Sequence, residues 1–289
     1  MKQLGIMVCV FAVLSSSRLA AEEWLGLDQE LPALVGIDLG RDEEEDSTAA
    51  FMLALPLGDS AGYYGYYSNT ELSDGGQEFD SLALATTVWF QLSQLVDLEL
   101  GHFFEGNDGE LEKETLGIAL GLSQGNWNFR VQLDEGELLI FTRDDVTDFL
   151  DRFIPDRFDS DVSGYGLTLG WQADPWYWQA SYQRFDYETD LTPLDSSRFA
   201  QFIVKSSALA QSSLLISEST SLLVGHADYD NDYSILIYQD QSAIDQSRAE
   251  TLALSWQHWA NPRFGYLLVA SMPVPADSVG LTLGLRWVL

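Results

Sequence analysis

The sequence predicts an all-β fold, a transmembrane antiparallel up-and-down β-barrel of about fourteen strands. Three observations predict it. Large apolar residues alternate with small or polar ones along most of the chain, aromatic residues gather at the ends of the alternating segments, and short linkers alternate with long acidic ones. Twelve or sixteen strands are the alternatives that this pattern leaves open.

Composition excludes two other classes of protein. Of the 289 residues, 46% are hydrophobic and 12% are aromatic, which is too many for a disordered chain. Lys and Arg number 14 against 45 Asp and Glu, so the formal net charge is 14 − 45 = −31. A chain this acidic repels the phosphate backbone, so we expect no nucleic-acid partner.

The first residues have the pattern of a secretory signal peptide. Lys2 precedes the apolar run Leu4 to Leu14, and small residues at Ala20 and Ala21 offer a cleavage point. The run is too short to cross a bilayer as a helix. We therefore expect a signal peptide over 1–21, a short segment over 22–32 and one barrel domain over 33–289. The only cysteine, Cys9, lies in the signal, which leaves no thiol for a disulfide or a metal.

Period-2 alternation identifies the strands. In 116–122 (LGIALGL) one face carries only Leu and Ile, and the other carries only Gly and Ala. A soluble β-sandwich would also alternate. Aromatic residues at strand ends favour a membrane barrel, because they mark the lipid–water interface. The tryptophans at strand ends are Trp127, Trp171, Trp176, Trp178, Trp256, Trp259 and Trp287.

Linker lengths supply the remaining argument, since membrane barrels have tight turns at one end and longer loops at the other. Long acidic linkers are expected at 41–47, 71–78, 105–113, 134–161 and 186–198. Short ones are expected at 58–61, 93–94, 123–126, 173–175, 218–220 and 261–263.

Fourteen segments fit this scheme. Segment 232–241 does not, because as a further membrane strand it would put the C-terminus on the wrong side. We therefore expect it to extend a neighbouring hairpin above the membrane. The strands are expected at 33–40, 49–57, 62–70, 80–91, 95–104, 114–123, 126–134, 162–172, 176–187, 204–217, 219–228, 249–259, 263–272 and 279–289.

The last segment, 280–289 (GLTLGLRWVL), resembles the C-terminal assembly strand of Gram-negative outer-membrane barrels. That strand usually ends in an aromatic residue, whereas here the aromatic is Trp287 and the last residue is Leu289. The resemblance implies an outer-membrane location, with 22–32 in the periplasm and with membrane lipid and the barrel assembly machinery as partners. The residues that would form the signal are Gly280, Leu281, Leu283, Gly284, Leu285, Trp287 and Leu289.

Polar residues that occupy the same alternate strand positions as the small residues should face the lumen. Polar side chains there indicate water or a network of paired groups. The alternative to a pore is that Asp97 and Glu99 pair with Arg130 and Arg286 and stiffen a closed barrel. A hydrophobic lumen would need apolar inward positions, which the pattern mostly lacks. The candidate lumen residues are Asp38, Asp97, Glu99, Arg130, Gln132, Gln179, Gln183 and Arg286.

No catalytic or cofactor site is expected. His102 and His258 are in phase with the lipid-facing residues, and Ser255 lies three residues from His258, on the opposite face of its strand. An acyl hydrolase, which pairs Ser with His, is therefore the weakest alternative. Acidic runs offer weak sites for divalent cations but do not match a calcium loop. Their residues are Glu43, Glu44, Glu45, Asp46, Asp228, Asp230 and Asp232.

A short helix is expected over 144–154, within the longest external loop, because its apolar residues recur at helical spacing and Pro155 follows. It would pack against neighbouring loops or act as a lid over the barrel mouth. Its apolar residues are Val146, Phe149, Leu150, Phe153 and Ile154.

The polar lumen makes a passive, porin-like channel for small cationic or neutral solutes the leading functional hypothesis. A structural or surface-binding barrel with cation-binding acidic loops is the second, and the acyl hydrolase is the third. All three rest on the expected fold.

Overall fold

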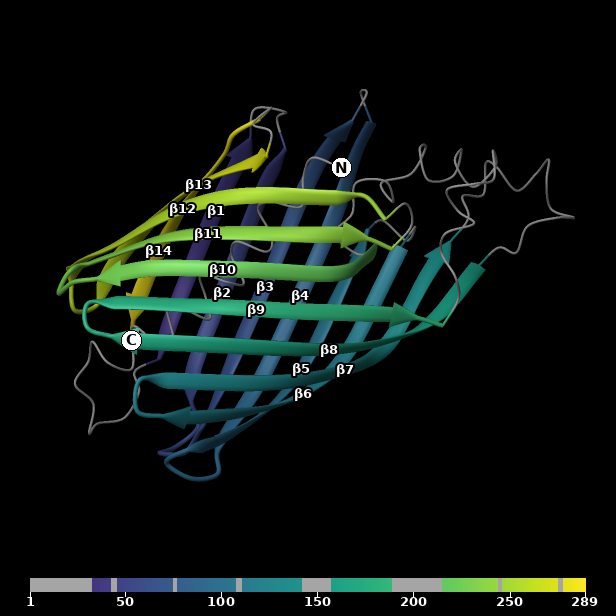
Figure 1. Ribbon diagram of the computed structural model, residues 1–289. Helices are drawn as coiled ribbons and strands as arrows, with labels where there is room; N and C mark the ends of the chain where they lie inside the picture. The colour runs from purple at the N-terminus through teal and green to yellow at the C-terminus, as the bar shows by residue number, and fades with distance from the viewer. Residues whose placement is uncertain are drawn as a thin grey trace, which may run out of the picture.

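The computed structural model is a closed barrel of antiparallel strands in which every strand pairs with its neighbours in sequence and β14 closes onto β1 (Figure 1). The structure describes residues 33–42, 46–74, 77–107, 111–141, 157–188, 215–243, 246–274 and 278–289. The predicted fold class and number of strands are therefore confirmed.

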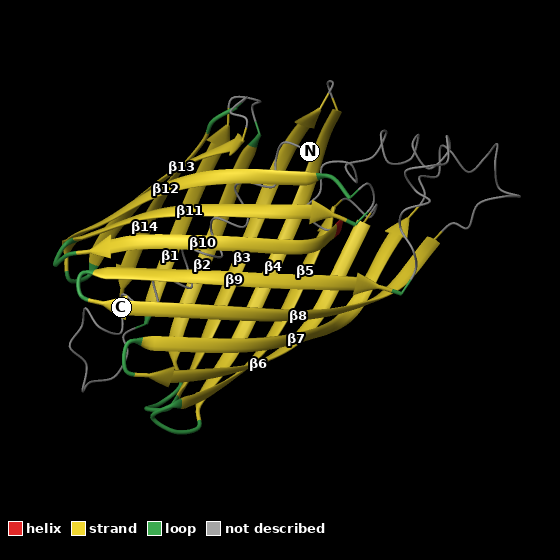
Figure 2. Ribbon diagram, viewed as in Figure 1, coloured by secondary structure: helices red, strands yellow, loops and turns green. Residues whose placement is uncertain are grey.

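Strands account for almost all of the described chain (Figure 2). Their bounds are β1 Leu34–Asp42, β2 Ser47–Pro56, β3 Ala61–Asp74, β4 Gln77–Gln91, β5 Val96–Asn107, β6 Leu111–Gln124, β7 Trp127–Phe141, β8 Arg157–Ala173, β9 Trp176–Tyr187, β10 Ile216–Ala227, β11 Asn231–Ser242, β12 Arg248–Asn261, β13 Phe264–Val274 and β14 Gly280–Val288. No helix in these ranges has the length and apolarity that crossing a membrane requires.

One end of the barrel carries the short turns. Gly125 and Asn126 alone connect β6 to β7, and Gly125 adopts a φ of 58°, which glycine tolerates without strain. Both ends of the described chain meet at this same end, where the backbone N–H of Leu289 donates to the carbonyl of Ala33 over 2.9 Å. The expected short turns lie at this end, except the one at 218–220. The expected long linkers are confirmed only between β7 and β8 and between β9 and β10, because 71–78 lies mostly within β3 and β4, and 105–113 mostly within β5 and β6.

The hairpin of β10 and β11 differs from the prediction. Segment 232–241 lies within β11 and spans the barrel wall, and Glu218 to Thr220 lies inside β10 instead of forming a turn. The turn is Asp228 to Asp230, where the Asp228 carboxylate accepts backbone N–H bonds from Asp230 and Asn231. Of the expected strand 204–217, residues 204–214 lie outside the described residues. The predicted count of fourteen was right because the prediction counted 204–217 as a strand and left 232–241 out of the count.

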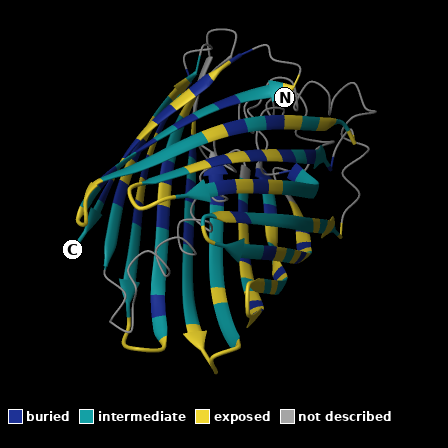
Figure 3. Ribbon diagram, turned by 60° about the vertical axis from the view of Figure 1, so that its left-hand side comes forward, coloured by how far each residue is buried: buried dark blue, intermediate teal, exposed yellow. Residues whose placement is uncertain are grey.

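The barrel has an apolar outer face. Along β14 the outward residues Leu281, Leu283 and Leu285 are exposed, whereas the residues between them are buried. The same alternation repeats around the barrel, and in Figure 3 exposed and buried positions alternate along single strands. An outer face of this composition requires a lipid environment, because water would solvate it poorly.

Aromatic side chains form a girdle on the outer face near the short turns. Trp127 contacts Trp178 with ring centroids 5.9 Å apart, and Trp287 contacts Phe264 at 5.6 Å. Trp259 was expected in this girdle but is turned inward over Gly265. The helix expected over 144–154, with its five apolar residues, lies outside the described residues.

Candidate functional site: the inner wall

All eight candidate lumen residues lie on the inner wall, because their positions alternate with the lipid-facing residues of the same strands. They fall into two groups. Asp38 and Arg286 lie at the β1–β14 seam, and the other six lie on β5, β7 and β9. The structure therefore brings the second group together on one side of the barrel.

Asp38 and Arg286 form a buried ion pair across the seam that closes the barrel. Both guanidinium NH groups donate to the carboxylate, and the Nη2–Oδ2 distance is 3.0 Å. Their side chains are only 5% and 3% exposed. The sequence suggested Asp97 and Glu99 as partners of Arg286, which is wrong: β1 and β14 are the neighbouring strands, so Asp38 is within reach.

The second ion pair links β7 to β5. Arg130 Nη2 donates to Glu99 Oε2 over 2.8 Å, as the sequence suggested, and the Arg130 side chain is 36% exposed. β6 lies between these two strands and presents Gly121 and Ala119 inward beside the pair. These small residues leave room for the two long side chains to meet.

A third cluster was missed by sequence reasoning. Lys113 is buried on β6 between Glu105 and Asp134, and its Nζ lies 3.9 Å from the centroid of the Phe185 ring. The Tyr187 hydroxyl accepts from Lys113 Nζ at 3.4 Å. The alternation could have placed Glu105, Lys113 and Asp134 inward, but these three residues fall in the linkers expected at 105–113 and 134–161.

Large inward side chains lie flat against the wall, over glycines of the neighbouring strand. A Cβ at Gly284 would collide with Asp38, one at Gly121 with Asp97, and one at Gly225 with the Tyr177 ring. Glycine is needed at these places because the neighbouring side chain occupies the volume of a Cβ. Side chains that lie along the wall do not project across the lumen.

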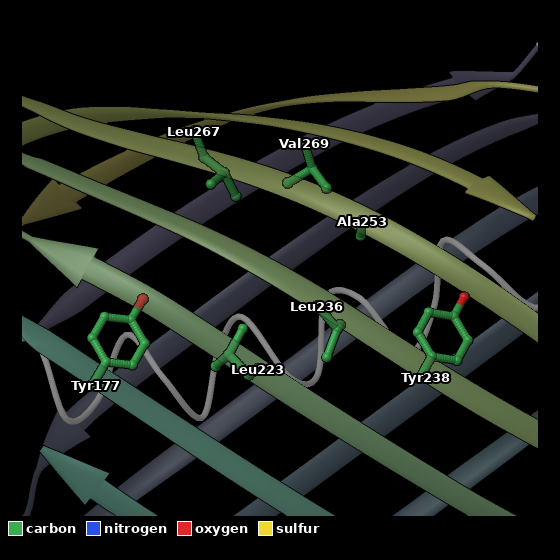
Figure 4. Close-up of a cluster of buried hydrophobic side chains, with 7 residues drawn as sticks. All are labelled: Tyr177, Leu223, Leu236, Tyr238, Ala253, Leu267 and Val269. Carbon is green, nitrogen blue, oxygen red and sulfur yellow. The ribbon is translucent and has the colours of Figure 1, made fainter.

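An apolar patch covers part of the inner wall on β9 to β13, contrary to the prediction that apolar inward positions are mostly absent. Figure 4 shows its side chains on adjacent strands. Leu223 and Leu236 are directly paired and only 2% and 1% exposed, so the patch is covered rather than open to water. The prediction failed because its candidate lumen residues include none from β10 to β13. The patch consists of Tyr177, Leu223, Leu236, Tyr238, Ala253, Leu267 and Val269.

The acidic turn at 228–232 has a structural role. The Asp228 carboxylate accepts bonds from the Asn231 side chain and two backbone N–H groups, which lowers the pKa of Asp228. Asp232 accepts the Tyr177 hydroxyl at 2.6 Å. Within the described ranges, no group of three or more His, Cys, Asp or Glu side chains could hold a metal ion. Asp46 is buried at the β1–β2 loop, and Glu43 to Glu45 lie outside the described residues.

The three histidines lie on the outer face. His102 bonds to Glu114 at 2.7 Å, and His226 contacts the Trp176 ring with centroids 4.7 Å apart. His258 Nδ1 lies 2.9 Å from Asn231 Oδ1, whereas Ser255 bonds to Ser234 on the inner wall. Ser255 and His258 are thus on opposite faces, as expected.

Comparisons with known proteins identify the fold of this chain but not its family. No family model matches the sequence, and no curated protein matches it. A solved structure of the CymD monoaromatic hydrocarbon channel is similar, with a TM-score of 0.52 and 6% identity over 90% of this chain and 88% of that one. The KdgM porin (TM-score 0.46, 5% identity, 88% and 99% covered) and a loop-deleted OmpT of Vibrio cholerae (0.45, 10%, 88% and 97%) superpose less closely. At these identities the likeness to CymD shows the barrel fold alone.

Proposed function

We propose that the chain is a passive, porin-like channel of a Gram-negative outer membrane that admits small cations and uncharged solutes. The observation that carries the proposal is the half-buried polar wall of β5 to β9, where Asp97, Asn128 and Asp134 lie over glycines of the neighbouring strands. Polar inward residues of this kind line aqueous paths in barrels of similar strand number.

The preference for cations follows from the charges of the wall. Each Lys or Arg that faces inward in the described chain, namely Lys113, Arg130 and Arg286, lies beside at least one carboxylate. The wall carries further carboxylates at Asp97, Asp232 and Asp240. The excess of carboxylates concentrates cations in the lumen, as the acidic loops do at the mouth.

Recording from the purified barrel in a planar lipid bilayer tests both parts. We expect discrete conductance steps and, in a KCl gradient, a reversal potential of the sign given by K⁺ permeation. Anion selectivity would contradict the predicted preference for cations but not the proposal that the protein is a channel. A silent bilayer would contradict the channel itself.

A structural barrel without conductance is the second candidate, and the covered apolar patch on β9 to β13 favours it. A patch this buried contributes to stability whether or not solute passes. The silent outcome of the bilayer recording would select this candidate.

A further inference from the structure

A polar ladder runs along the inner wall of β7, β8 and β9. Three rows follow from the strand register: Asn128, Gly170 and Gln179; Arg130, Thr168 and Ser181; Gln132, Gly166 and Gln183. Successive rows are two residues apart along each strand, or about 7 Å. The side chains of the ladder are half-buried, in contrast to the covered apolar patch beside them.

The hydrogen bonds of the ladder fix which of its atoms remain available. Gln132 Nε2 donates to both oxygens of Asp134, at 2.8 and 3.0 Å, and Gln183 Nε2 donates to the same carboxylate at 3.4 Å. A carboxylate can only accept, so these contacts assign the amide orientations. The two Oε1 atoms therefore remain as acceptors, with no donor within the described part of the chain.

The ladder also offers donors and carries little net charge. Thr168 Oγ1 and Ser181 Oγ share one hydrogen bond at 3.2 Å, so one of the two hydroxyls can still donate. Arg130 is neutralised by Glu99, and Asp134 lies near Lys113. A surface that mixes acceptors and donors suits a neutral solute rich in hydroxyl groups, because hydroxyls both donate and accept.

Two tryptophans lie inside the barrel at the short-turn end, where the ladder begins. Trp259 of β12 lies over Gly265, with its Cε3 2.9 Å from the place of a Cβ, and Trp89 of β4 lies over Gly62, with its Cζ2 at 2.6 Å. β4 and β12 are on opposite sides of the ring of strands. Both indoles are half-buried and lie along the wall, where they offer apolar surface to a ring-shaped solute.

We infer that the lumen binds neutral saccharides, whose rings combine apolar faces with rows of hydroxyl groups. The hydroxyls would bond to the ladder at Gln132, Ser181 and Gln183, and a ring face would pack on Trp259 or Trp89. This inference rests on the proposed channel for the route by which the sugar enters. It names the substrate class, which the charge argument leaves open.

Maltotriose is the probe, used in two independent measurements on the full chain. In a planar bilayer, its addition should produce reversible interruptions of the ionic current. In detergent, calorimetry should show saturable binding. A polyethylene glycol of similar mass, which lacks rows of hydroxyls, should produce neither effect.

Two variants and two matched controls locate the site. Gln183→Leu and Trp259→Leu should each weaken maltotriose binding about fivefold to tenfold, the range that one lost polar or stacking contact represents. Gln239→Leu and Trp178→Leu remove the same groups from the outer face and should leave binding unchanged. Heat-modifiable migration verifies that each variant is folded.

The outcomes separate this inference from the proposed function. Conductance without calorimetric binding of maltotriose overturns the inference and keeps the channel. Binding without conductance keeps the saccharide site and overturns the channel. Equal weakening by the inner and outer variants also overturns the inference, because the sugar would then bind elsewhere.

Discussion

At the scale of single residues, Asp38 and Arg286 combine burial with charge at the seam of the barrel. Each side chain is at most 5% exposed, and the pair is bidentate. Removing one partner would leave the other charge buried and unpaired, which costs far more than losing the attraction itself. The pair therefore matters most when it is broken on one side only.

We predict that Asp38→Asn lowers the free energy of unfolding by about 3 kcal/mol. The double variant Asp38→Leu with Arg286→Met should lose less, because no charge is left unpaired. Urea unfolding in detergent measures both. Glu99→Gln is the matched control: its partner Arg130 is 36% exposed, so water compensates and the loss should stay near 1 kcal/mol. Equal losses at the two sites would contradict the role of burial.

The inward glycines give a second prediction at this scale. A Cβ at position 225 would displace the Tyr177 ring from the wall and break its 2.6 Å bond to Asp232. Gly225→Ala should therefore push the ring toward the lumen and reduce single-channel conductance. In Gly101→Ala the new Cβ meets nothing closer than 3.7 Å, so conductance should not change. A similar fall in both variants would mean that the packing of Tyr177 over Gly225 does not determine the conductance.

At the scale of strands, the register places like charges directly opposite one another on the outer face. Glu114 of β6 faces Glu137 of β7, and Glu137 faces Asp161 of β8. Directly opposed like charges destabilise a sheet. Glu135, two residues away on the same face, is opposed by Leu116 and Ser163 instead.

We predict that Glu137→Gln raises the free energy of unfolding by about 0.5 kcal/mol at low salt, because it removes the central charge of the row. The gain should vanish in 1 M NaCl, where the screening length falls to about 3 Å. Glu135→Gln should change little. Thermal melts at two salt concentrations provide the measurement, and equal gains for both variants would show that net charge, not register, is responsible.

Sequence reasoning located most strands because alternation depends only on neighbouring residues. It failed at β10 and β11, where the polar run Glu218 to Thr220 looked like a turn and the true turn is made by Asp228. Turn and strand compete locally for the same polar residues, and barrel closure decides between them. Contacts are harder still: Asp38 and Arg286 are 248 positions apart, so no local pattern could pair them.

At the scale of the whole molecule, closure of the barrel depends on β14. This strand pairs with β13 on one side and with β1 on the other, and it supplies Arg286 to the buried ion pair. Within lipid, an unpaired strand edge leaves backbone N–H and C=O groups unsatisfied, each at a cost of several kcal/mol. Two edges would open at once if β14 were missing.

Deleting Gly280 to Leu289 should therefore abolish assembly in the outer membrane. The full chain should fractionate with that membrane and migrate faster on gels without heating than after it, because a closed barrel resists detergent in the cold. The truncated chain should lose both properties. Deleting Leu289 alone is the control: it lies beyond β14 and contributes one backbone bond to Ala33, so assembly should persist. Normal migration of the ten-residue deletion would mean that β1 and β13 can close the barrel without the last strand.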